Sequence, residues 1–187
     1  GWGHGLEGTG RGVPTIRESG TYTRLDCGIG TAGMMREAVV QAIHHARHRA
    51  SFGAMLVEHP LMQTVLADLA LESEAATALA LRLARAFDAG ESESETLFRR
   101  LMTSASKFWV CKRGPELAAE AMEVLGGNGY VEEGPLARSY REMPGTSIWE
   151  GSGNSKCPHV LSDFCKSSPT GRCTARKTTR KTDRQPR

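Results

Sequence analysis

The sequence predicts an all-α protein, an antiparallel helical bundle followed by a basic tail. Apolar residues recur at helical spacing in three long stretches, and short breaks rich in glycine or proline separate them. No stretch of useful length alternates polar and apolar residues as a half-buried strand does. The chain has 187 residues, 39% of them hydrophobic and 24% charged, which is enough for one domain with a core.

The first two helices are expected at residues 25–49 and from Pro60 to Phe87. The break at residues 51–53 ends the first, and proline suits the first turn of the second. Residues 88–90 stop the second helix. At 1.5 Å per residue it would be about 40 Å long, as in an antiparallel bundle.

A third helix is expected at residues 95–125, and its inward positions would be Leu97, Leu101, Phe108 and Cys111. Gly114-Pro115 falls inside it and predicts a kink or a break, because proline removes a backbone donor. The glycines at 126–129 end it. A short helix at 135–141, a turn at Pro144-Gly145 and a last helix from near Glu150 would follow.

Three segments differ in composition. Residues 1–20 are glycine-rich and are expected to be a linker left from a preceding domain that this chain lacks, and residues 21–166 would form the bundle. Residues 167–187 carry seven basic residues and one acid, a net charge of +6. Because the whole chain has a net charge of +3, the other residues together have a net charge of −3. This tail has no apolar periodicity and is expected to be disordered.

The composition excludes several classes of protein. No apolar run approaches the roughly 20 residues of a membrane span. Five widely spaced cysteines without a CxxC pair predict neither a disulfide framework nor a zinc site, and they favour a reducing, cytoplasmic location. His44 and His48 could share a metal, but no third ligand is evident, so no metal is predicted.

Gly28-Ile29-Gly30-Thr31-Ala32-Gly33 matches the GxGxxG pattern of dinucleotide-binding turns. No apolar strand leads into it, and no second strand with an acid at its end follows. The pattern therefore favours small residues on a helix face that let a neighbouring helix approach closely.

Three further motifs each have two readings. Arg49 with Phe52 at a helix end suits a phosphate-bearing cofactor, or it is a cation at a helix C-terminus. The segment from Glu123 to Tyr130 brings backbone amides to a ligand, or it only stops a helix. Glu150, between Trp149 and a glycine, is a desolvated general base, or a glutamate at a helix start beside a capping serine.

The order of these motifs, RxxFG, a long helix, LGGxGY, a downstream Arg and WEGS, resembles the C-terminal domain of the acyl-CoA dehydrogenase superfamily. The resemblance covers about residues 5–157. It is strongest to the AidB branch, the bacterial alkylation-response flavoproteins, in the stretches Arg24-Leu25-Asp26-Cys27, Lys112-Arg113-Gly114, residues 120–127 and Tyr140-Arg141-Glu142-Met143-Pro144.

The resemblance implies a four-helix bundle, usually in a homotetramer, with FAD lying between domains and reaching across a subunit interface. By resemblance, Glu150 is the catalytic base, while Arg24 and Gly151 lie at the acyl-CoA site. The cofactor would be contacted by Arg49 and Phe52 from a neighbouring subunit, and also by Glu123, Gly126, Gly127, Ser152, Gly153 and Asn154.

The chain departs from the family pattern at several positions. Glu123 and Pro60 stand where many members have glutamine, and Ser152 stands where threonine is common. The first two changes weaken a simple transfer of cofactor hydrogen bonds, whereas Ser152 keeps a hydroxyl. After Cys157 the resemblance stops.

The implied reaction is α,β-dehydrogenation of an acyl-CoA, with a carboxylate base and the flavin as hydride acceptor. Without the preceding domains, the chain alone is expected neither to bind flavin tightly nor to turn over. Two alternatives remain. One is a nucleic-acid role of the AidB type, aided by the basic tail, and the other is a bundle that only serves oligomerisation.

Overall fold

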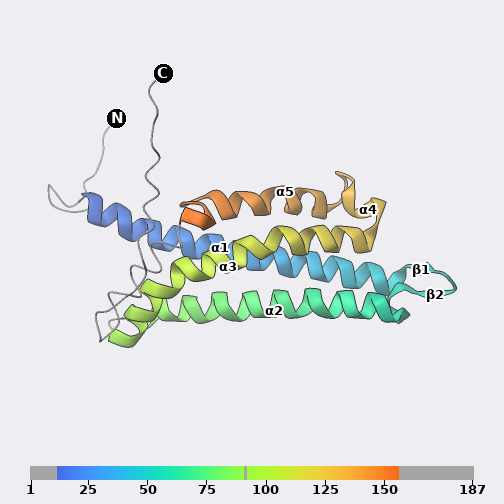
Figure 1. Ribbon diagram of the computed structural model, residues 1–187, viewed down its shortest axis with the longest axis horizontal. Helices are drawn as coiled ribbons and strands as arrows, with labels where there is room; N and C mark the ends of the chain where they lie inside the picture. Colours follow the sequence, from blue (N-terminus) through green and yellow to red (C-terminus); the bar gives the residue numbers. More distant parts are fainter. Residues whose placement is uncertain (1–11, 91, 156–187) are drawn as a thin grey trace, which may run out of the picture.

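The computed structural model describes residues 12–90 and 92–155 (Figure 1). Its elements in chain order are α1 (Gly12–His48), β1 (Ala50–Ser51), β2 (Ala54–Met55), the 3₁₀ turn η1 (Leu56–Glu58), α2 (Pro60–Asp88), α3 (Glu93–Leu125), α4 (Gly127–Tyr130) and α5 (Pro135–Ile148). The predicted all-α class is confirmed.

Four of the helices form the bundle. α1 packs against α2, α3 and α5, and α3 also packs against α2 and α5 (Figure 1). The two-stranded hairpin of β1 and β2 joins α1 to α2 at one end of the bundle. The core between the helices is apolar, and its most deeply buried members include Met35, Val39, Val110, Leu136 and Met143. None of the described helices combines the length and the apolar character that a membrane crossing requires.

α1 begins at Gly12, so the linker expected at residues 1–20 is wrong for residues 12–20, and residues 1–11 lie outside the described part. The first turns of α1 are supported by contacts with other helices, which the local sequence does not reveal. The rings of Tyr22 and Phe87 lie 5.2 Å apart, which ties α1 to the end of α2. At Gly20, α1 passes close to the turn after α5, because a Cβ there would lie 3.7 Å from Glu150 Oε2.

Two proline positions also differ from expectation. α3 continues through Gly114-Pro115 without a break, and α5 continues through Pro144-Gly145 to Ile148, where a turn was predicted. Packing explains both outcomes: Gly114 lies against α1 and α5, and Met143 is fully buried. The helix expected from Glu150 is wrong, since this residue lies in a turn and helical structure resumes only at residue 153.

The predicted inward face of α3 is correct only in part. Cys111 is fully buried, and Leu101 and Phe108 are half-buried. Leu97 is 40% exposed, so its inward assignment is wrong. It belongs to the first turns of α3, at the far end of that helix from its contacts with α4.

Candidate functional site

The candidate site centres on the turn that follows α5. The helix ends at Ile148, and Glu150 and Gly151 both have positive φ angles, 55° and 97°. A positive φ is unusual for a residue with a side chain, because Cβ crowds the backbone. The predicted base therefore lies at a special backbone position, not on a regular helix.

Two cationic side chains hold this turn through its backbone carbonyls. From α1, Arg24 Nε donates to the carbonyl oxygen of Glu150 at 3.3 Å. From α3, Lys107 Nζ donates to the carbonyl oxygens of Ser147 and Gly151, at 3.2 and 3.1 Å. The structure thus brings Arg24 beside Glu150 and Gly151, three residues that the family resemblance assigns to one site.

The carboxylate of Glu150 is exposed and makes no hydrogen bond or ion pair with any described residue. A base must have its lone pairs free to accept a proton from substrate. The neighbouring Trp149 is 54% exposed and lies against Gly145, so the expectation that it desolvates Glu150 is wrong for a single copy of the chain. The side chain is thus available for chemistry while its backbone is held.

A buried polar cluster joins α1, α3 and α5 beneath the turn. The hydroxyls of Thr31 and Thr146 lie 2.8 Å apart, and the Thr31 hydroxyl lies 3.3 Å from Cys111 Sγ. Burial raises the pKa of the Cys27 thiol, although the nearby Lys107 charge acts in the opposite direction. Cys27 therefore remains a neutral thiol, and this cluster serves as structural support.

Ser152, Gly153 and Asn154 follow the turn directly. Gly153 is buried, and a side chain there would meet Phe108 and Lys112 at 3.0 Å. Ser152 and Asn154 are exposed on either side of it. These two predicted cofactor residues therefore lie next to Glu150 with their side chains accessible.

Arg49 and Phe52 lie at the hairpin. Ala50 pairs with Met55 and Ser51 with Ala54, which leaves Phe52 at the tip with φ 52° and a side chain that is 96% exposed. His59 supports the tip, because its Nε2 lies 3.0 Å from the Ser51 carbonyl oxygen. An aromatic side chain so exposed at a tip that is itself well anchored is suited to contact a planar ligand.

Glu123, Gly126 and Gly127 lie where α3 ends. A groove of about 480 Å³ is lined there by Ala119, Met122, Glu123, Gly126, Tyr130 and Tyr140. No atom lies within 4 Å of the position that a Cβ would take on Gly126 or Gly127. The open backbone and the exposed Tyr130 and Tyr140 leave room for a flat ring, whereas Glu123, the one charged side chain of this lining, does not favour a phosphate.

These predicted residues fall into two groups along the bundle. One lies beside the end of α5, part of the way along α1 and α3, and the other lies at the end of the bundle that carries the hairpin and α4 (Figure 1). The first group, called the base cluster here, contains Arg24, Glu150, Gly151, Ser152 and Asn154. The second, called the hairpin-end cluster, contains Arg49, Phe52, Glu123, Gly126 and Gly127. Arg24 and Arg49 are 25 positions apart along α1, which corresponds to about 37 Å. One copy of the chain therefore does not assemble all ten residues around one cofactor.

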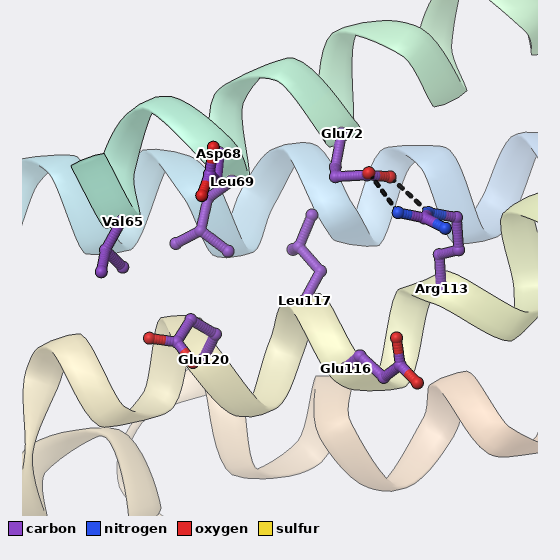
Figure 2. A pocket seen from close by; sticks show the side chains of 8 residues that line it. All are labelled: Val65, Asp68, Leu69, Glu72, Arg113, Glu116, Leu117 and Glu120. Carbon is purple, nitrogen blue, oxygen red and sulfur yellow. Dashed lines mark hydrogen bonds and ion pairs between the residues drawn. The ribbon is translucent and has the colours of Figure 1, made fainter. Parts of the chain in front are cut away.

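A second groove, of about 380 Å³, lies between α2 and α3 and contains none of the predicted residues (Figure 2). Its apolar floor is flanked by four carboxylates and by Arg113, which pairs with Glu72 across the groove. The hydrogen bond from Arg113 to Glu72 raises the pKa of the guanidinium. The pair links two helices at a partly exposed surface, so it contributes little to stability.

Sequence reasoning missed Lys107. It is 2% exposed and lies on the buried face of α3, with Thr103 four positions before it and Val110 three positions after it. A charged residue at a core position of the helical period was the available signal. His44 and His48 do not form a metal site with other described residues, and no group of three or more metal-ligating side chains occurs among residues 12–90 and 92–155.

The glycines of the GxGxxG pattern lie in the middle of α1 and not at a turn from a strand into a helix. This position excludes the dinucleotide-binding reading. The expected close approach is not at these glycines, because no atom lies within 4 Å of a Cβ built on Gly28, Gly30 or Gly33. It occurs at Gly114, where a Cβ would lie 2.7 Å from Thr31 Cγ2.

Comparison with known proteins shows a consistent similarity. Residues 10–162 match the family model for the acyl-CoA dehydrogenase C-terminal domain. The putative acyl-CoA dehydrogenase AidB of Escherichia coli is 53% identical over 161 residues, covering 86% of this chain and 29% of that protein. The glutaryl-CoA dehydrogenase of Desulfococcus multivorans is 32% identical, covering 78% of this chain and 36% of that enzyme.

Solved structures share the fold. Caenorhabditis elegans ACDH-11 in complex with C11-CoA has a TM-score of 0.79 at 30% identity, covering 84% of this chain and 27% of that one. Butyryl-CoA dehydrogenase from Megasphaera elsdenii has a TM-score of 0.75 at 24% identity, covering 83% of this chain and 39% of that one, and supports the fold alone. The chain thus spans well under half the length of these relatives.

Proposed function

Because the chain belongs to the acyl-CoA dehydrogenase family, whose C-terminal domain it matches over residues 10–162, we propose that it is the helical domain of a flavin-dependent acyl-CoA dehydrogenase-like oxidoreductase. The proposed reaction is α,β-dehydrogenation of an acyl-CoA thioester. Glu150 acts as the general base, and Arg24 and Gly151 lie at the substrate.

The exposed carboxylate of Glu150 on a held backbone turn is the observation that carries this proposal. Arg24 and Lys107 hold the carbonyls around it, while the carboxylate has no partner among the described residues. Such a group can remove the acidic proton from the carbon next to a thioester. When bound, FAD supplies the hydride acceptor for the adjacent carbon.

The hairpin-end cluster supports a cofactor site shared between two copies of the chain. Arg49 offers a guanidinium that can bind phosphate oxygens, and Phe52 offers an exposed ring. Because the two clusters lie far apart along the bundle, each site takes the base cluster from one copy and the hairpin-end cluster from another. A homo-oligomer, which by the family pattern is a tetramer, would place them together.

Replacing Glu150 by glutamine in the full-length, flavin-containing protein tests the base. Butyryl-CoA or C11-CoA should bleach the flavin of the E150Q variant about 10²–10⁴-fold more slowly, because a positioned base contributes that much. The exposed Glu142 on α5 gives the matched control, E142Q, which should bleach at the normal rate. Unchanged bleaching by E150Q at normal flavin content would refute the assignment.

A nucleic-acid role is the second candidate, favoured by the net +6 charge of residues 167–187, which lie outside the described residues. Clustered cations attract phosphates non-specifically, so duplex binding would weaken steeply with salt. Truncation after residue 166 should remove this binding. Binding that is absent or independent of salt excludes the role.

Substrate-dependent flavin reduction excludes a purely oligomerising bundle.

A further inference from the structure

Lys107 is the one charged side chain that is buried among the described residues, with 2% of its surface exposed. Burying an ammonium group costs several kcal/mol unless polar partners surround it. No described carboxylate forms an ion pair with it. Its retention in the core of α3 therefore requires a specific reason, which its two hydrogen bonds supply.

Both hydrogen bonds go to backbone carbonyls at the two ends of one short segment. Ser147 and Gly151 accept from Lys107 Nζ at 3.2 and 3.1 Å, and Glu150 lies between them in the sequence. Ser147 belongs to the last turn of α5, where carbonyls lack helical partners and a cation is favourable. A single ammonium group thus bridges the helix end and the turn that follows it.

The bridged segment has a backbone that needs support. Glu150 has φ 55°, a left-handed conformation that is unfavourable for a residue with a side chain. Such conformations persist only when surrounding contacts fix them. Arg24 contacts the segment from α1, but this contact is exposed, whereas the two contacts of Lys107 are part-buried and come from a buried side chain.

We propose that Lys107 is the positioning residue for the proposed base: its ammonium group fixes the 147–151 backbone in the conformation that presents the Glu150 carboxylate. The catalytic consequence rests on the proposed function. The effect on the turn itself does not, so the two are measured separately.

The experiment compares K107M and K107R with the unsubstituted full-length, flavin-containing protein. V39A is the control, because Val39 is 1% exposed in the core and its truncation destabilises the bundle without touching the turn. Hydrogen exchange at the amides of residues 148–152 reports on the turn. Single-turnover flavin reduction by butyryl-CoA and C11-CoA, with the substrate Kd, reports on the chemistry.

K107M should speed exchange at residues 148–152 and slow reduction by roughly 10–100-fold, because a misplaced reacting group costs up to about that much. The substrate Kd should change little. V39A, compared at an equal loss of thermal stability, should change neither quantity. K107R keeps a charged donor with another geometry, so its exchange rate at residues 148–152 and its reduction rate should lie between those of K107M and the unsubstituted protein. If K107M does not fold, K107R alone still tests the proposal.

Normal exchange at the turn in both Lys107 variants would overturn the proposal. Equal losses in V39A and K107M would also overturn it, since the effect would then be general destabilisation. If neither acyl-CoA reduces the unsubstituted protein, the proposed function fails, and the exchange measurement still decides whether Lys107 fixes the turn.

Discussion

Gly114 and Thr31 meet where α3 packs closely against α1. A Cβ on Gly114 would lie 2.7 Å from Thr31 Cγ2 and 3.2 Å from Met143 Sδ. Both neighbours are fully buried and have little freedom to move. The absence of a side chain at position 114 is therefore a packing requirement, although glycine is a poor helix former.

We expect G114A to lower the free energy of unfolding by about 1–3 kcal/mol, because overpacking outweighs the gain of about 1 kcal/mol in helix propensity. Adding T31S removes the crowded methyl group, keeps the hydroxyl and should recover most of the loss. G33A is the control: no atom lies within 4 Å of its new Cβ, so it should be neutral or stabilising. Denaturant unfolding measures these three variants, T31S alone and the unsubstituted protein, and additive losses in the double variant would contradict the packing argument.

Individual residues of the site were predictable where a motif fixed them. The family resemblance assigned Arg24, Glu150 and Gly151 to one site, and the structure brings these three together. The positive φ of Glu150 and the role of Lys107 were not predictable, because each depends on contacts between residues 40 or more positions apart. Whether Glu150 is the base remains a prediction.

At the scale of elements, α2 and α3 carry two buried hydroxyls, those of Ser73 and Ser106, that have no partner among the described residues. A buried hydroxyl without a hydrogen bond costs free energy of solvation. The Thr31 hydroxyl, in the cluster of α1, α3 and α5, instead has three polar atoms within hydrogen-bonding distance. Loss of a hydroxyl should therefore have opposite effects on the free energy of unfolding at Ser73 and at Thr31.

We expect S73A to leave the free energy of unfolding unchanged or to raise it by up to about 1 kcal/mol, because the lost hydroxyl had no partner. T31V, nearly equal in shape to threonine, should lower it by about 1–3 kcal/mol, since it leaves polar groups without their partner. Thermal or denaturant unfolding measures both. A clear loss of stability in S73A would show that its hydroxyl has a partner.

The long helices were predictable because apolar residues repeat at their period over many turns. The ends of α1 and α5 were not. α1 begins before the apolar repeat, and α5 continues through Pro144, because the packing of Tyr22 on Phe87 and the burial of Met143 outweigh local preference. The hairpin escaped prediction because each of its strands has only two residues.

At the scale of the whole molecule, Arg24 of the base cluster and Arg49 of the hairpin-end cluster lie about 37 Å apart in the direction of α1. Under the proposed function, a complete site needs both clusters, so it needs two copies of the chain. Damage to one cluster in one copy therefore leaves that copy able to contribute its other cluster to a neighbour.

This geometry predicts complementation between inactive full-length variants. R49A and E150Q should each lose activity, but their co-assembled mixture should regain about a quarter of the normal activity, because random pairing leaves that share of sites intact. A mixture of R49A and F52A is the control and should regain nothing, since both changes fall in the hairpin-end cluster. Flavin bleaching by butyryl-CoA measures the recovery. No recovery from R49A with E150Q would mean that each copy forms its site alone.

The attachment of Lys107 to carbonyl oxygens has a consequence for how new specificities can arise. Every residue has a carbonyl, so this anchoring does not depend on which side chains occupy positions 148 and 149. Ile148 and Trp149 are 64% and 54% exposed, free of the anchoring contacts. Substitutions at these two positions can therefore reshape the surroundings of Glu150 during divergence or directed evolution while the base keeps its place.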